Sequence, residues 1–302
     1  MTRDLPLVSV IVITYKSARF VLDTLESVKR QTYPRLELIV SDDCSPDETL
    51  AICREWLDVK ANRDRFVSTR IVSTPRNGGI CANYNNSLGY AKGEWIKYIA
   101  GDDELLPNCI EEYMKATSKS DDRIFVAGTV PFNAEEGKLA PRIPSLSYLG
   151  FTAYEQETRL LEVGTVLEGP TIFLEATTLR RLGGFDMRYP FIEDYPLFMK
   201  YLSNGLRIGV VEKALVNYRE YPESVSRSEN SPFGSSILAA IEDASIAAWK
   251  KRQKYLNAYH WWCERQIRLN LRGNRKLGKL GAILSYLLRL TDPVGIRKHF
   301  QN

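Results

Sequence analysis

Short apolar runs alternate with segments of helical periodicity through the first half of the chain, and this alternation restricts the fold more than any other feature. The run at residues 7–13 is almost entirely apolar and rich in Val and Ile, which is typical of a strand buried on both faces of a parallel sheet. The pattern predicts further strands, separated by helices, at 36–40, 66–73, 95–99 and 124–127. We therefore expect an α/β fold with a doubly wound, mainly parallel sheet and right-handed crossovers.

The pattern is less regular after residue 128. Residues 128–150 contain several Pro and Gly residues and are interpreted as a loop or insertion. Beyond them the sequence predicts strands at 171–174, 207–211 and 214–218, and short helices at 175–182 and 196–202. A polar loop at 221–234 precedes a helical pattern that starts at residue 235. The expected organisation is one domain over 1–234, with halves at about 1–128 and 129–234, and a helical tail over 235–302.

Composition and residue counts exclude several classes of protein and site. With 44% hydrophobic and 26% charged residues among 302, the chain is neither disordered nor collagen-like. No apolar run approaches the roughly 20 residues of a membrane span and no signal-peptide pattern is present, so we expect a soluble, cytoplasmic protein. The five cysteines lack C-x-x-C spacing, which argues against structural zinc and a disulfide framework. Both histidines, at 260 and 299, lie in the tail, so chemistry in the first 250 residues must use other side chains.

The tail is strongly basic. Residues 249–302 contain thirteen Lys/Arg and two acidic residues, whereas the rest of the chain contains 28 basic and 35 acidic residues. Apolar side chains within 277–288 recur at helical spacing, which predicts an amphipathic helix. Two interpretations stay open: the helix packs on the body of the protein or on a second copy in a homo-oligomer, or it binds an anionic membrane surface. A nucleic acid partner is not expected, because base-stacking motifs are absent and the body is acidic.

Polar motifs follow the predicted parallel strands, at the edge where open α/β sheets bind their ligands. They are Thr14 and Tyr15 after the first strand, Asp42 and Asp43 after the second, Asn77 and Gly78 after the third, and Asp102 and Asp103 after the fourth. Two acidic pairs brought to one edge repel each other and need a compensating positive charge. A divalent metal ion, bound through carboxylates and diphosphate oxygens, would supply that charge.

Each acidic motif also has a purely structural explanation. Residues 45–48 read Ser-Pro-Asp-Glu, a capping box with proline at the first helical position, and acids are favoured near such a helix start. Asp102 and Asp103 are equally compatible with a turn. Glu193 and Asp194, in the second half, precede a predicted helix in the same way. In a site without histidine, however, carboxylates are the natural general bases.

Two nucleotide-binding fingerprints are absent from the sequence. No G-x-G-x-x-G follows the first strand, and no G-x-x-x-x-G-K-[ST] is present. The motifs that are present resemble, in their order and spacing, those of family 2 glycosyltransferases with the GT-A fold, over about residues 5–227. Besides the strand-end motifs, they include Ala91-Lys92-Gly93-Glu94-Trp95-Ile96, Gly183-Gly184-Phe185-Asp186 and Glu193-Asp194.

The resemblance implies a role for each motif. It implies nucleotide binding by Thr14, Tyr15, Asp43, Asn77, Gly78, Asp102 and Arg219, a divalent metal (Mn²⁺ or Mg²⁺) on Asp103 and Asp102, and catalysis by Asp194 as base with Glu193 beside it. The expected reaction moves a sugar from a nucleotide-sugar, with UDP favoured, to a hydroxyl of a glycan or lipid-linked acceptor, inverting the anomeric configuration. Residues 1–128 would form the nucleotide-binding half and 129–234 the acceptor half. Surface-polysaccharide or O-antigen-type assembly at the cytoplasmic face of the inner membrane is the expected setting.

Two departures from the family pattern keep other functions open. Tyr84 and Tyr221 stand where the family often has arginine and histidine, so a non-catalytic binding protein on a degenerate transferase fold is one alternative. A sugar nucleotidyltransferase is another, although such enzymes usually carry a Gly-rich, basic loop after the first strand. The segment Thr14-Tyr15-Lys16-Ser17 does not resemble that loop.

Overall fold

The computed structural model describes residues 5–133, 137–144, 150–163, 167–222, 224, 233–251, 257–263, 266 and 292. The chain divides into two compact units, Met1–Phe233 and Gly234–Asn302. The strands that the structure describes all lie in the first unit, together with every predicted site residue.

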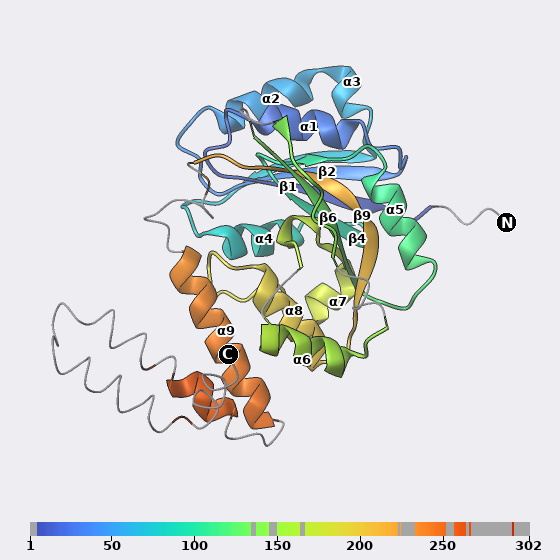
Figure 1. Ribbon diagram of the computed structural model, residues 1–302. Coiled ribbons are helices and arrows are strands. Elements are labelled where there is room, and N and C mark those ends of the chain that lie inside the picture. Colours follow the sequence, from blue (N-terminus) through green and yellow to red (C-terminus); the bar gives the residue numbers. More distant parts are fainter. Residues whose placement is uncertain are drawn as a thin grey trace, which may run out of the picture. The chain divides into compact units, whose positions relative to one another are not determined.

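Four parallel strands form the half of the sheet that carries the strand-end motifs. They are β1 (Val8–Thr14), β2 (Leu36–Asp42), β3 (Ser68–Ser73) and β4 (Trp95–Ala100), in the order β3-β2-β1-β4. Every residue of β2 and all but one of β1 are buried, as expected for strands covered on both faces. Figure 1 shows α1 (Val21–Lys29) and α2 (Thr49–Asp58) on one side of these strands and α4 (Ile80–Leu88) on the other. The predicted doubly wound α/β arrangement is confirmed.

The second half of the sheet mixes strand directions. β8 (Phe173–Glu175) runs antiparallel to β4 and to β6 (Ile124–Asn133), whereas β6 and β9 (Ile208–Arg219) pair in parallel. The short strands β5 (Glu104–Leu105) and β7 (Gly137–Lys138) pair antiparallel with β9 and β6. The long pairings are parallel and the short ones antiparallel, so the sheet is mixed but mainly parallel.

Strands β6 and β9 correct the sequence prediction. Residues 128–133 belong to β6 rather than to a loop, because they pair with β9, and β9 is one strand rather than two. The β6–β9 register shifts around Gly128, where a Cβ atom would lie 2.5 Å from the carbonyl oxygen of Arg142. Because Gly128 has no side chain, the backbone at Arg142 can approach β6 closely enough for Thr129 and Arg142 to pair. A local sequence pattern does not reveal such long-range pairing.

The remaining helices of this unit are short. They are α3 (Lys60–Arg63), α5 (Cys109–Thr117), α6 (Ala153–Val163), the 3₁₀ turn η2 (Gly169–Thr171), α7 (Ala176–Arg181) and α8 (Asp194–Ser203). The sequence did not predict α3, α6, η2, β5 or β7, and β7 lies in the segment that was expected to be a loop. The predicted capping box is wrong: α2 begins at Thr49, and the Ser45 hydroxyl donates to Asp42 Oδ1 at 2.5 Å. The Ser45 hydroxyl, which was expected to cap the helix, is therefore bonded to the Asp42 carboxylate instead.

The second unit contains all of α9 (Phe233–Lys251) except Phe233, and a helical stretch at 257–263. His260 is buried, and its Nδ1 lies 2.6 Å from Oδ2 of Asp292. Tyr259 and Trp262 are exposed and stack on each other, with ring centroids 5.7 Å apart. The amphipathic helix predicted within 277–288 lies outside the described residues. In the part of the chain that the structure describes, no helix is both long and apolar enough to cross a membrane.

An aromatic stack lies at the centre of the first unit. The Phe173 ring packs between Trp95 and Tyr113, with centroid distances of 5.2 and 4.7 Å and planes within 1° and 9° of parallel. Phe173 is fully buried. Because these rings come from β8, β4 and α5, the stack joins the two halves of the sheet to the helix that covers them.

The Phe173→Ala variant is expected to lose about 3–5 kcal/mol of unfolding free energy, because it leaves a cavity between two rings. Urea unfolding followed by tryptophan fluorescence measures the loss. Leu22→Ala, at a position 47% exposed on α1, is the control and should change stability by less than about 0.5 kcal/mol. Equal effects of the two substitutions would contradict the central role of the stack.

Candidate active site

The parallel register brings the ends of β1, β2 and β4 to one edge. Thr14 aligns with Asp42 on β2, and Ile13 aligns with Ala100 on β4. The Thr14 hydroxyl donates to Asp42 Oδ1 at 2.8 Å, and the Asp43 N–H donates to the Thr14 carbonyl at 2.9 Å. The segments that follow these strands therefore start side by side.

Asp43 is 3% exposed and lies against the segment that follows β3. Its carboxylate accepts hydrogen bonds from the Thr74 hydroxyl (2.8 Å) and from the backbone N–H groups of Gly78 (3.0 Å) and Gly79 (2.8 Å). Gly79 has a φ of 86°, and its N–H also donates to Asn77 Oδ1 at 3.2 Å. The structure thus brings together three predicted nucleotide-binding residues, Asp43, Asn77 and Gly78.

Thr14 and Tyr15 differ in exposure. Thr14 is buried against Asp42, whereas Tyr15 is 43% exposed, with the Lys16 ammonium 5.4 Å from its ring centroid. Lys16 has a φ of 54°, in the left-handed region, and its N–H donates to the Ser45 hydroxyl at 3.0 Å. A non-glycine residue in this region is uncommon and often marks a functional loop. The Tyr15 ring is accessible to a ligand. Thr14 is not, and its hydroxyl instead holds the side chain of Asp42.

Asp102 and Asp103 lie just beyond β4 and contact the end of β9. The Tyr221 hydroxyl donates to Asp102 Oδ2 at 2.7 Å, and the Arg219 N–H donates to Asp103 Oδ1 at 2.8 Å. The Asp103 carbonyl accepts the Thr24 hydroxyl of α1 at 2.7 Å. Asp103 is 2% exposed and Asp102 is partly buried. The pair is therefore held from two sides, by α1 and by β9.

Burial and proximity make this pair electrostatically costly. Burial raises the pKa of the Asp102 carboxyl, and the hydrogen bond from Tyr221 opposes the rise. Burial raises the pKa of Asp103 well above its ordinary value, and the charge of Asp102 raises it further. An added cation would stabilise both ionised carboxylates.

A lysine lies buried on the same strand. Lys97 is fully buried in β4, and burial lowers its pKa to about 8. Its Nζ donates to the carbonyls of Tyr98 (2.5 Å) and Pro170 (2.6 Å), and its charge lowers the pKa of Asp103. Lys97 therefore links the strand that ends at the acidic pair to η2, which contains Pro170.

Arg219 is occupied by contacts within the protein. Its guanidinium lies 4.3 Å from the ring centroid of Phe20 and 4.5 Å from that of Phe132. Nε donates to the Asp102 carbonyl at 2.7 Å, and Nη2 lies 3.0 Å from Asp23 and 3.2 Å from Glu104. These contacts fix the end of β9 over the acidic pair. A further contact with the diphosphate stays a prediction.

Glu193 and Asp194 form a second acidic pair, at the start of α8. Asp194 is the first residue of the helix, and its Oδ1 accepts the Tyr195 N–H at 2.6 Å. Both side chains are partly buried. Burial raises the pKa of both carboxyls, and the charge of Asp194 adds to the rise at Glu193. A raised pKa brings a carboxylate closer to the proton affinity that a general base needs near neutral pH.

Residues on η2 and just before it complete the surroundings of Asp194. A Cβ atom at Gly169 would lie 3.1 Å from Asp194 Oδ2, so glycine allows this close approach. Burial raises the pKa of Glu168, Arg142 opposes the rise, and Asp194 adds to it. Sequence reasoning missed Glu168 and Lys97. The lone lysine in an apolar strand was a visible signal, whereas nothing in the sequence marked Glu168.

The donor set at Asp102 and Asp103 fits a divalent cation that takes its other ligands from a substrate. Within the described ranges, no group of three or more His, Cys, Asp and Glu side chains is placed to hold a metal ion. Mg²⁺ typically binds one or two carboxylates together with substrate phosphates and water. The second carboxylate oxygen of Asp103 accepts no hydrogen bond from the described residues. The pair therefore suits a cation shared with a diphosphate.

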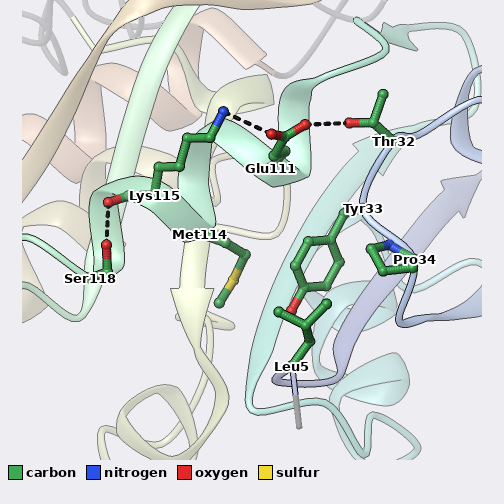
Figure 2. Close-up of a pocket in the computed structure, with 8 residues that line it drawn as sticks. All are labelled: Leu5, Thr32, Tyr33, Pro34, Glu111, Met114, Lys115 and Ser118. Atoms are coloured by element: carbon green, nitrogen blue, oxygen red, sulfur yellow. Dashed lines mark hydrogen bonds and ion pairs between the residues drawn. The ribbon is translucent and has the colours of Figure 1, made fainter. Parts of the chain in front are cut away.

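A surface hollow of about 460 Å³ lies elsewhere on this unit (Figure 2). Tyr33 and Met114 line it, and a Glu111–Lys115 ion pair of 2.8 Å crosses its rim. Its residues Leu5 and 32–34 precede β1 and β2, so it lies at the amino ends of these strands. It is therefore separate from the strand-end site.

Comparisons with known proteins agree with this architecture. The family model "Glycosyl transferase family 2" matches residues 9–175. "Putative glycosyltransferase EpsE" of Bacillus subtilis (strain 168) is 27% identical over 229 residues, covering 74% of this chain and 76% of EpsE. An "Uncharacterized glycosyltransferase" of Rickettsia typhi (strain ATCC VR-144 / Wilmington) is 26% identical over 65% of this chain and 59% of its own length.

Solved structures of S. aureus TarS share the fold. TarS 1-349 in complex with UDP-GlcNAc gives a TM-score of 0.62 at 18% identity, covering 97% of this chain and 92% of the TarS chain. At this identity the likeness concerns the fold alone. The family model covers more than half of the chain and includes both strand-end acidic pairs. The protein is a glycosyltransferase of family 2, built on the GT-A fold.

Proposed function

We propose that the protein transfers a sugar from a UDP-sugar to a hydroxyl of a glycan or lipid-linked acceptor, with inversion at the anomeric carbon. The observation that carries this proposal is the presence of two acidic pairs held by hydrogen bonds, Asp102 and Asp103 just beyond β4 and Glu193 and Asp194 at the start of α8. The first suits a cation-bound diphosphate, and the second suits removal of a proton. TarS, which shares the fold, was solved with UDP and with UDP-GlcNAc, and this favours a UDP-sugar.

The proposed nucleotide site lies at the ends of β1 to β3. Tyr15 offers an exposed ring, and Asp43 holds the backbone of Gly78. Asn77 lies on the same segment and fixes Gly79. Thr14 supports this edge through Asp42. In this arrangement the base contacts Tyr15 and the Asp43 region, and the diphosphate extends toward Asp102 and Arg219.

The Asp43→Ala variant is expected to bind UDP about 10- to 100-fold more weakly, because a charge-assisted hydrogen-bond acceptor of the nucleotide segment is lost. Isothermal titration calorimetry with UDP measures the change. Asp58→Ala, at an exposed position at the end of α2, is the matched control and should leave the dissociation constant unchanged. An unchanged constant in Asp43→Ala would remove Asp43 from the site.

Asp102 and Asp103 are the proposed ligands of Mn²⁺ or Mg²⁺. When bound, the ion neutralises charge on the departing nucleoside diphosphate. The pair's own contribution is a fixed orientation, because the Arg219 N–H and the Tyr221 hydroxyl each bond one carboxylate oxygen. The charges of Lys97 and Arg219 oppose the rise in the pKa of Asp103 that burial causes. The diphosphate of the nucleotide-sugar would therefore bind at the edge formed by the ends of β4 and β9.

Asp194 is the proposed general base. Its side chain lies next to Gly169, so backbone rather than a bulky side chain borders it on that side. Glu193 has a raised pKa and adjoins Asp194, so one proton is readily retained by the pair. Asp194 takes the proton from the acceptor hydroxyl as that oxygen attacks the anomeric carbon. Attack opposite to the leaving diphosphate inverts the configuration.

The Asp194→Asn variant is expected to lose about 10²- to 10⁴-fold in kcat, because a positioned base is removed. Its affinity for UDP should be unchanged. In the wild type, kcat should rise with pH as Asp194 loses its proton, and the raised pKa places this rise above the range of an ordinary aspartate. Steady-state kinetics with a UDP-sugar panel measures both effects, with Asp58→Asn as control. Turnover within threefold of wild type would exclude Asp194 as the base.

An anionic membrane surface, at the cytoplasmic face of the inner membrane, is the proposed location of a lipid-linked acceptor. The excess of basic residues over 249–302 supports this proposal. Tyr259 and Trp262 are exposed in the same unit, and such aromatic side chains favour membrane interfaces.

The full-length chain is expected to float with vesicles that contain phosphatidylglycerol, and a chain that lacks residues 274–302 is expected to float much less. Attraction between the basic tail and anionic lipid is the reason, so salt should weaken the binding. Phosphatidylcholine vesicles are the control. Absence of flotation of the full-length chain at low salt would contradict the membrane proposal.

A further inference from the structure

The end of β9 contacts both members of the acidic pair that follows β4. The Tyr221 hydroxyl donates to Asp102 Oδ2 at 2.7 Å, and the Arg219 backbone N–H donates to Asp103 Oδ1 at 2.8 Å. One carboxylate oxygen on each aspartate is therefore bonded from the same three-residue segment.

This segment is itself held in place. The Tyr221 ring lies 5.2 Å from that of Phe20, centroid to centroid. The Arg219 guanidinium lies between the rings of Phe20 and Phe132, and the Glu220 N–H donates to the Phe132 carbonyl at 2.8 Å. Since the phenol and the guanidinium both pack on Phe20, the direction from which Tyr221 reaches Asp102 is fixed.

Both of these donors are electrically neutral. Burial and the charge of Asp102 raise the pKa of the Tyr221 phenol, so it is uncharged at neutral pH, and a peptide N–H carries no net charge. The guanidinium of Arg219 instead forms ion pairs with the carboxylates of Asp23 and Glu104, and it donates a hydrogen bond to the backbone carbonyl of Asp102. Asp102 and Asp103 are therefore oriented by hydrogen bonds without forming an ion pair with the residues that orient them. Among the residues that the structure describes, no neighbouring cationic side chain that orients the pair occupies the place of a cation on these two carboxylates.

We propose that Tyr221 is a positioning residue for a divalent cation, fixing the orientation of the Asp102 carboxylate through its hydroxyl. The inference deepens the proposed function, because it rests on the cation site at Asp102 and Asp103. Hydrogen-bond partners of metal-binding carboxylates orient the ligands, and their loss typically lowers metal affinity about 10- to 100-fold. A different outcome would follow if the hydroxyl competed with the cation for Asp102: affinity would then rise when the hydroxyl is removed.

Mn²⁺ binding to the full-length protein distinguishes these outcomes without nucleotide or sugar. Free Mn²⁺ is followed by electron paramagnetic resonance during titration of wild type and Tyr221→Phe, which keeps the ring on Phe20. The dissociation constant for Mn²⁺ should be about 10- to 100-fold higher in Tyr221→Phe. Tyr90→Phe, at a position 41% exposed, is the matched control and should bind like wild type. Asp102→Asn should abolish binding, which identifies the site being measured.

An unchanged or lower dissociation constant in Tyr221→Phe overturns the inference, provided that thermal unfolding without metal shows the variant to be folded. Were the variant unfolded, Tyr221→Leu would repeat the test with an apolar side chain that has no hydrogen-bond donor. If wild type binds no Mn²⁺, the inference and the metal site both fail, while sugar transfer in the presence of a chelator still tests the proposed function. Conversely, Mn²⁺ binding that depends on Asp102 and Tyr221, without sugar transfer from any UDP-sugar, would leave the inference standing and refute the function.

Discussion

The parallel pairing of β1 with β2 and β4 is the constraint on which the site depends. Because the three strands point the same way and are in register, their carboxyl ends meet at one edge. The residues at these ends and just beyond them then contact one another through hydrogen bonds, such as those of Thr14 with Asp42 and of Asp43 with the Thr14 carbonyl. The apolar composition of the strands gives the sheet its stability, and the few polar residues just beyond them give the edge its chemistry.

The cost of this arrangement is like charge held away from water. Asp102 and Asp103 repel each other, and burial adds to the penalty of ionising them. The positive charge of the buried Lys97 offsets part of this penalty. The hydrogen bond from the Arg219 N–H, at the end of β9, offsets another part. Lys97 also bonds to Pro170, whose neighbour Gly169 borders Asp194. The two acidic pairs are therefore connected by one buried side chain and one short turn.

The sequence was a good guide wherever structure follows from local pattern. The apolar runs identified β1 to β4, and the residues after them included the pairs Asp42-Asp43 and Asp102-Asp103. It failed where distant segments determine the outcome. Residues 128–133 looked like a loop until their pairing with β9 was known, and Ser45 looked like a helix cap until Asp42 proved to be its partner. Glu168 had no sequence signal, because its position near Asp194 depends on how η2 packs.

The sequence by itself determined the order of the parallel strands β1 to β4, the family, and the identity of the charged residues at the ends of these strands. These depend on periodicity and on motifs within a few residues of each other. Only the tertiary structure decided the bonding of those residues: Arg219 lies between two rings rather than open to solvent, and the Tyr221 hydroxyl reaches Asp102. Such contacts join residues that are distant in the sequence. Their geometry depends on the packing of the whole sheet, which no local pattern encodes.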